Sequence, residues 1–130
     1  PLPNNPVFMY TRDNFQRPNP FRPDVAVDIS AVFQQKLNGI DAHTSQVYEW
    51  LPWTRHDTTV PTDPQQRKQW LGTVYAGRSR VTPEVKTSLE KWYGPERAAR
   101  VRHAEAFELC EYGRNPSEEE LRRLFPMLGK

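Results

Sequence analysis

Histidine is the side chain best suited to metal binding or proton transfer near neutral pH, and this sequence has three of them. His43, His56 and His103 are far apart, and no His-x-x-x-His pair is present to supply two ligands to one metal ion. His56 and Asp57 are the only histidine and carboxylate that are adjacent, in a loop-like segment bounded by prolines. A solvated imidazole is the better interpretation of His56.

His43 is the most interesting of the three because it lies inside the strongest helical pattern of the sequence. Gln46 follows three residues later, so both side chains share one helical face and could enter one polar pocket. The alternative is that His43 packs at a helix crossing, where a backbone carbonyl satisfies its ring. We favour the packing role and keep His43 as a candidate pocket residue.

A second group of candidates follows the short apolar run of residues 7–10, which predicts a buried strand. In a sheet of parallel strands, ligands bind beyond the carboxyl ends of the strands. Tyr10, Arg12, Asp13 and Asn14 would then lie beside a pocket. A surface ion pair between Arg12 and Asp13 explains these two residues equally well.

The sequence lacks the local motifs of several enzyme classes. Its six glycines are scattered, so it has neither a Gly-rich phosphate loop nor a Gly-x-Ser-x-Gly nucleophile turn. Cys110 is the single cysteine, which excludes an internal disulfide and a Cys-x-x-Cys metal or redox site. The residues alone therefore do not describe a self-sufficient enzyme.

The elements that must position these residues are predicted from periodicity and capping signals. Residues 1–28 are expected to form the strand, a proline-rich arm and a brief second strand at Val25 and Val27, and residues 29–51 one long helix. Phe15 and Phe21 of the arm must lie on another surface to escape water. Residues 62–130 are expected to form a region of helices and strand-like segments, within which residues 101–112 fit either a helix or a strand. Three helix starts are marked by Asp63-Pro64, Thr82-Pro83 and the pair Ser117 and Glu120.

The composition fits one small domain with a thin core. Of 130 residues 36% are apolar, and 13 prolines argue against an all-helical bundle. No apolar run approaches the roughly 20 residues of a membrane-spanning helix. The chain begins Pro1-Leu2-Pro3 without a signal-like region, so we expect a piece of a longer protein and favour the cytoplasm as its compartment.

Basic residues gather in residues 67–102, although the net charge of the whole chain is only +2. One interpretation is a non-enzymatic binding module for nucleic acid or another anionic polymer, in which Trp70 and Trp92 stack on the ligand. The other is the solvated side of ordinary helices. We favour the second, because the basic residues are spaced out and do not cluster.

Three segments in a fixed order resemble the later part of the LmbE-like (PIG-L) deacetylases. Residues 25–46 contain Val-Asp-Ile-Ser before a helix that ends in His-Thr-Ser-Gln. Residues 13–23 are similar to the arm that precedes this helix in the family, and residues 104–113 are similar to its late Ala-Glu-Ala-Phe segment. The resemblance covers nearly the whole chain.

The resemblance implies an α/β fold, namely the C-terminal portion of a Rossmann-like sandwich completed by a missing N-terminal half. It also implies a hydrolase that uses a divalent metal, usually zinc, to remove N-acetyl groups from sugar-containing substrates. The family's metal ligands and general base come from a His-Pro-Asp-Asp and a His-Pro-Asp-His motif, and neither occurs here. The resemblance therefore assigns no catalytic or zinc-binding residue to this chain and expects them upstream.

The same resemblance implies the partners. They are the upstream half of the same protein and an N-acetylated sugar-type substrate. We do not expect nucleic acid as a partner, and homo-oligomerisation stays open. Tyr10, Arg12, Asp13 and Asn14 become candidate substrate-pocket residues, and His43 has a packing or rim role.

Overall fold

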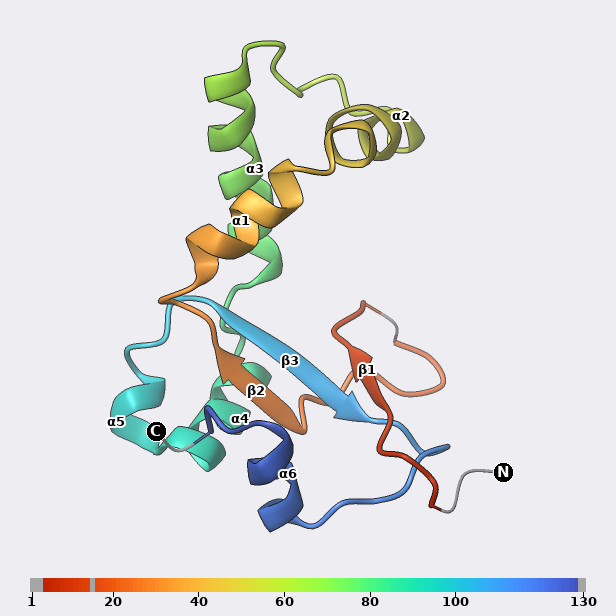
Figure 1. The fold of residues 1–130 in the computed structure, drawn as a ribbon, viewed down its shortest axis with the longest axis vertical. Helices are drawn as coiled ribbons and strands as arrows, with labels where there is room; N and C mark the ends of the chain where they lie inside the picture. The colour runs from red at the N-terminus through yellow and green to blue at the C-terminus, as the bar shows by residue number, and fades with distance from the viewer. Residues whose placement is uncertain (1–3, 15, 129–130) are drawn as a thin grey trace. The chain divides into compact units, whose positions relative to one another are not determined.

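The chain folds into two compact units, each with its own core (Figure 1). The computed structural model describes residues 4–14 and 16–128. We call residues 1–29 with 81–130 the sheet unit, and residues 30–80 the helical unit. The predicted mixture of helices and strands is confirmed.

The sheet unit contains three strands, β1 (Met9–Thr11), β2 (Val25–Asp28) and β3 (Ala104–Leu109). They form an antiparallel sheet in the order β1-β3-β2. The brief strand at residues 25–27 is confirmed, and residues 104–109 adopt the strand state of the two that the sequence allowed. The sheet of the described residues has no parallel pair, so the parallel-sheet argument for residues 10–14 does not apply to it.

Small side chains let a helix pack closely on one face of this sheet. Ala26 pairs with Ala106 in register, and both are buried against α4 (Pro83–Tyr93). Residues alternate between the faces of a strand, so the neighbouring Phe107 faces the other way. It packs there against Phe125, with 5.5 Å between the ring centroids.

The three marked helix starts are confirmed by side-chain caps. Asp63 accepts hydrogen bonds from two backbone N–H groups of α3 (Pro64–Arg78), and Thr82 accepts one at the start of α4. Ser117 does the same for α6 (Glu118–Leu124). The short α5 (Pro95–Ala98) follows α4 in the sheet unit. These starts were predictable because each cap depends on residues only two or three positions away.

The prediction of one helix over residues 29–51 is wrong. The structure has α1 (Phe33–Asp41), a π-helix η1 (Ser45–Trp50) and α2 (Leu51–Thr54). Ile29 instead extends the sheet, since its N–H donates to the His103 carbonyl at 3.0 Å. A proline ring clashes with the carbonyl four residues earlier in an α-helix, and the wider π turn before Pro52 is consistent with relief of that clash.

The strand at the start of the chain is shorter and more exposed than predicted. β1 lies at an edge of the sheet, where it pairs only with β3 among the described strands. Phe8 is 50% exposed and Tyr10 41% exposed, so the prediction of a buried strand is wrong. No helix in the described part of the chain is long and apolar enough to cross a membrane.

The helical unit is held by Leu37, Val47 and Leu71 packed around a polar interaction. The hydroxyl of Tyr48 donates to the Asp41 carboxylate at 2.7 Å, and Lys68 lies 3.3 Å from the same carboxylate. The hydrogen bond from Tyr48, together with the nearby Lys68, holds the pKa of Asp41 below its usual value. Burial, followed by the hydrogen bond to Asp41, raises the pKa of Tyr48 to about 12.

Tyr48→Phe removes this hydroxyl and is expected to lower the free energy of unfolding by about 1 kcal/mol at pH 7. The stabilisation linked to Asp41 is present above its unfolded pKa near 3.9 and is lost as the pH falls through the lower folded pKa. Melting wild type and variant at neutral pH and at about pH 3 should therefore show a difference that shrinks in acid.

Tyr75→Phe is the matched control. In the described structure the Arg78 guanidinium lies over the Tyr75 ring, and no carboxylate accepts from the Tyr75 hydroxyl. It should show no such pH dependence. An equal loss for Tyr48→Phe at both pH values would contradict the role of Asp41.

Candidate functional site

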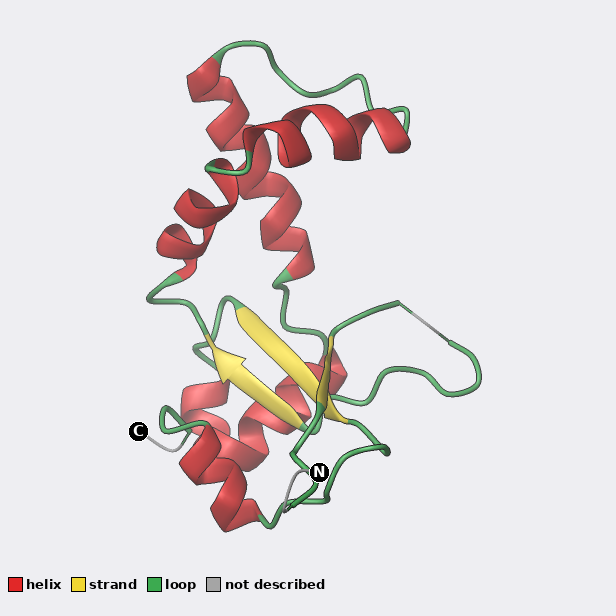
Figure 2. Ribbon diagram, turned by 45° about the vertical axis from the view of Figure 1, so that its right-hand side comes forward, coloured by secondary structure: helices red, strands yellow, loops and turns green. Residues whose placement is uncertain are grey.

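A cavity of about 530 Å³ lies in the sheet unit, between the arm before β2 and the end of β3. Its volume falls within the range of about 300–1,000 Å³ typical of small-molecule sites. Most of the arm between β1 and β2 is loop (Figure 2). The charged and phenolic groups of the lining are Tyr10, Asp13, Arg17, Arg22, Glu108 and Glu111.

Antiparallel pairing brings the two ends of the sequence together at this cavity. Tyr10 lies opposite Glu108 in the register, and the Cys110 N–H donates to the Phe8 carbonyl at 3.0 Å. A Cβ on Gly113 would lie 2.8 Å from the Phe8 nitrogen, so only glycine allows this close approach. The chain after β3 is thereby held beside β1.

Tyr10 is a neutral hydrogen-bonding group at physiological pH. Its hydroxyl lies 3.3 Å from Glu111 Oε2, to which it donates. Hydrogen bonding to the Cys110 side chain, followed by burial and the nearby Glu111 charge, raises the pKa of Tyr10 above its usual value. The phenol therefore keeps its proton and is a poor general base.

Asp24 holds the side chain of Arg22, a residue of the arm that lines the cavity. Its carboxylate binds Arg22 in a bidentate pair, at 2.7 Å to Nε and 3.1 Å to Nη2. Asp24 Oδ2 also accepts from the Leu109 N–H at 2.8 Å, and its backbone carbonyl accepts from the Trp92 indole at 2.8 Å. The Arg22 N–H in turn donates to Glu108 at 3.1 Å. The hydrogen bond to Asp24 raises the pKa of Arg22, which stays charged.

The structure brings together two of the five candidate pocket residues. Tyr10 and Asp13 line the cavity. Arg12 and Asn14 are outside its described lining, and the charge of Arg12 lies close enough to lower the pKa of Glu84. His43 is exposed in the helical unit between α1 and η1, so its predicted packing at a helix crossing is wrong.

Four charged residues of the lining were missed at the sequence level: Arg17, Arg22, Glu108 and Glu111. Arg17 and Arg22 lie in the arm whose aromatic residues were predicted to rest on another surface. Phe21 does so, because it packs against the core beneath α4, and Phe15 lies outside the described residues. That prediction was the available signal that the arm folds back over the sheet.

The residues that the structure describes do not fit a zinc site. They contain no group of three His, Cys, Asp or Glu side chains that could hold a metal ion. His56 is exposed with a left-handed φ of 52°, and the neighbouring Asp57 carboxylate accepts from the N–H and hydroxyl of Thr59. The adjacent pair His56 and Asp57 is therefore a turn.

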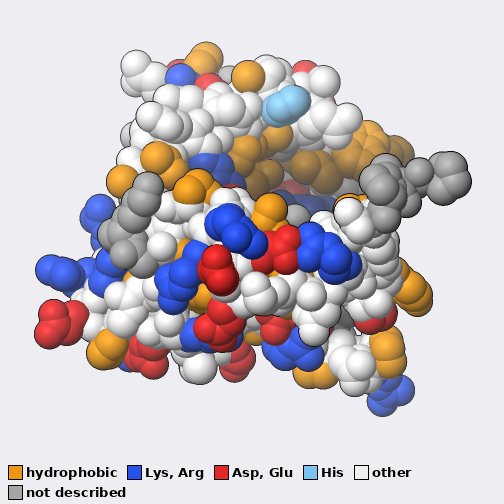
Figure 3. Space-filling view, turned by 60° about the horizontal axis from the view of Figure 1, so that its bottom comes forward, with side chains coloured by type: hydrophobic (Ala, Val, Ile, Leu, Met, Phe, Trp, Pro, Cys, Tyr) orange, Lys and Arg blue, Asp and Glu red, His pale blue; other side chains and the backbone are white. Residues whose placement is uncertain are grey.

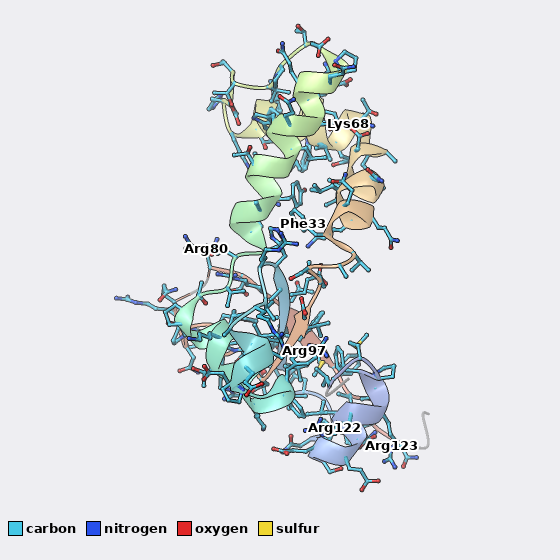
Figure 4. The ribbon with its side chains drawn as sticks, turned by 90° about the vertical axis from the view of Figure 1, so that its left-hand side faces the viewer. Phe33, Lys68, Arg80, Arg97, Arg122 and Arg123 are labelled. Atoms are coloured by element: carbon cyan, nitrogen blue, oxygen red, sulfur yellow. The ribbon has the colours of Figure 1, made fainter. Side chains whose placement is uncertain are left out.

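The basic stretch of residues 67–102 is divided between the two units. Trp92 is only 2% exposed and Trp70 is half-buried, with its indole N–H donating to Thr59 Oγ1 at 3.3 Å. On the face drawn in Figure 3 basic and acidic side chains are interspersed. The cations labelled in Figure 4 lie on α3, on the loop after it, on α5 and on α6: Lys68, Arg80, Arg97, Arg122 and Arg123. Ion pairs within the stretch or to other segments are Lys68–Asp41, Lys86–Glu90, Lys91–Glu118 and Arg97–Asp28.

These features weaken the alternative of a binding module for an anionic polymer. A buried indole such as Trp92 cannot stack on bases, and paired cations contribute little to phosphate binding.

No protein-family model matches the chain, and neither a curated protein nor a solved structure matches it. The candidate site therefore rests on its geometry and on the chemistry of its side chains.

Asp24→Ala is expected to lower the free energy of unfolding by about 1–3 kcal/mol, because it leaves the Leu109 N–H and the Arg22 guanidinium without their carboxylate. Urea unfolding of both proteins measures the loss. Asp57→Ala is the control, since that carboxylate serves a turn two residues long. A loss no larger than that of the control would contradict the role of Asp24.

Zinc is expected to bind this chain weakly. His43, His56 and His103 lie on separate segments, and zinc needs converging ligands. Calorimetric titration of the chain with zinc chloride should show no stoichiometric submicromolar site. Tight stoichiometric binding that is lost on His-to-Ala substitution would show that a site exists within this chain.

Proposed function

We propose that the chain is part of a metal-dependent hydrolase that removes N-acetyl groups from sugar-containing substrates. The metal, zinc by resemblance, and the general base come in this proposal from an upstream segment. The observation that carries the proposal is the cavity lined by Tyr10 and Asp13, because it has the size of a small-molecule site and both side chains offer hydrogen-bonding groups to sugar hydroxyls.

The chemistry of the lining suits a sugar ring. Carboxylates accept hydrogen bonds from sugar hydroxyls, and Asp13 and Glu111 offer such groups beside the phenol of Tyr10. Arg17 adds donors from the arm. The role of these residues in the proposed reaction is to bind and orient the substrate, and no step of bond cleavage is assigned to them.

The proposal includes a larger fold, in which the sheet unit completes a Rossmann-like α/β sandwich with an upstream half. The edge position of β1 and the exposure of Phe8 support it, since an edge strand can pair with a further strand and an exposed aromatic can be covered. In this arrangement the upstream half is the partner that brings the metal to the cavity.

Asp13→Ala should reduce kcat/KM for an N-acetylated sugar while leaving the melting temperature nearly unchanged, because Asp13 is exposed and lines the cavity. The assay is acetate release by the chain expressed with its upstream coding sequence. His43→Ala is the matched control. His43 is exposed in the helical unit, so its loss should change neither turnover nor stability measurably.

Unchanged kinetics in the Asp13 variant, together with a large kcat loss in the His43 variant, would move the site to the helical unit. Absence of acetate release from any N-acetylated sugar by the wild-type protein would contradict the proposed function itself.

A further inference from the structure

The cavity between the arm and the end of β3 has an excess of negative charge. Its described lining contains three carboxylates and two guanidinium groups, namely Asp13, Glu108, Glu111, Arg17 and Arg22. Arg22 does not offset the three carboxylates, because its charge is already balanced by Asp24. Arg17 is therefore the one cation of this described lining that opposes them.

Two of these carboxylates accept hydrogen bonds from neutral groups. Glu111 accepts from the Tyr10 hydroxyl at 3.3 Å, and Glu108 accepts from the Arg22 backbone N–H at 3.1 Å. A neutral donor satisfies one oxygen and leaves the negative charge of the carboxylate in place. Glu111 and Arg17 are both exposed, and no ion pair joins them in the described structure. Each of these two charges can therefore act on a molecule in the cavity.

The form of the cavity favours an organic cation over a metal ion. Side chains that bind a metal ion converge on one point, and the described residues contain no such group of three acidic, histidine or cysteine side chains. The cavity of about 530 Å³ has room for a small molecule with a ring. An ammonium group on such a molecule has three N–H donors, which carboxylates bind strongly because both partners are charged.

The reaction proposed above produces a cation of this kind. Hydrolysis breaks the C–N bond of the acetamide, the water oxygen becomes part of acetate, and the nitrogen takes both water protons. One neutral amide and one water thus give one acetate anion and one ammonium cation on the sugar, so atoms and charges balance. An acidic lining attracts the ammonium cation and repels the acetate.

We propose that this cavity binds the protonated amino sugar more tightly than a neutral sugar of the same shape, through the negative charges of Glu108 and Glu111. The inference rests on the proposed function, which supplies the amine as its product. The deacetylated sugar then competes with further substrate for the cavity, so the reaction is inhibited by its own product.

The test compares glucosamine with glucose, because the two sugars differ only in an ammonium group in place of one hydroxyl. Calorimetric binding uses the protein prepared as for the acetate-release assay, in a slightly acidic buffer that keeps the amine protonated. Glucosamine should bind about fivefold tighter than glucose at low salt, which corresponds to about 1 kcal/mol. The preference should shrink at about 1 M sodium chloride, where the Debye length is about 3 Å. Glucosamine should also inhibit acetate release more strongly than glucose does.

Two variants change the charge of the lining in opposite directions. Glu111→Gln keeps an acceptor for Tyr10 and removes one negative charge, so the preference for glucosamine should fall to about twofold. Arg17→Gln removes the opposing cation, so the preference should rise to about tenfold. Glu119→Gln is the control and should leave the preference unchanged, because Glu119 is an exposed residue of α6 that pairs with Arg123 outside the lining.

The outcomes separate this inference from the proposed function. If the two sugars bind equally while acetate is released, the inference is refuted and the proposed function stands. If glucosamine is preferred and neither Glu111→Gln nor Arg17→Gln changes that preference, the selectivity comes from other groups and the inference is refuted. If the preference and both shifts are found without acetate release from any N-acetylated sugar, the charge preference stands and the proposed function is refuted. If neither sugar binds, the inference is refuted, and acetate release alone decides the proposed function.

Discussion

The carboxylate of Asp24 is the constraint on which the sheet unit depends. It binds Arg22 and the backbone of Leu109, while the carbonyl of the same residue accepts from Trp92. These contacts join segments that are 85 and 68 positions away in the sequence. Hydrogen bonds to an ionised acceptor are about twice as strong as neutral ones, so one residue ties the arm, the end of β3 and α4 together.

This constraint also decides what kind of ligand the cavity can attract. A free Arg22 in the lining would favour phosphate or carboxylate groups. Because Asp24 neutralises Arg22, Arg17 is the other cation of the lining and faces the three carboxylates of Asp13, Glu108 and Glu111. This balance of charge favours hydroxyl-rich molecules over anions. The four ion pairs of Lys68, Lys86, Lys91 and Arg97 act in the same direction, and they weaken the argument for an anionic polymer as the partner.

Local signals in the sequence predicted local structure well and failed where distant residues decide. The caps at Asp63, Thr82 and Ser117 were predictable because a cap needs only its own first turn. The helix over residues 29–51 was not, because apolar periodicity continues across residues 42–44 although the hydrogen-bonded helix does not. The exposure of β1 depends on its position at the edge of the sheet. That position is set by pairing with distant residues, so it could not be predicted from residues 7–10 alone.

The candidate site was also predicted only in part, and the reason is geometric. In an antiparallel pair the start of one strand lies beside the end of the other, so a cavity at that edge takes residues from both ends of the chain. Tyr10 meets Glu111 across 101 positions of sequence. The rule for parallel sheets considers only residues beyond a strand's carboxyl end, so it reaches Asp13 after β1 and cannot anticipate that the end of β3 returns there. Only the pairing register of β1 with β3, which Gly113 permits by its close approach to Phe8, adds Glu108 and Glu111 to the site.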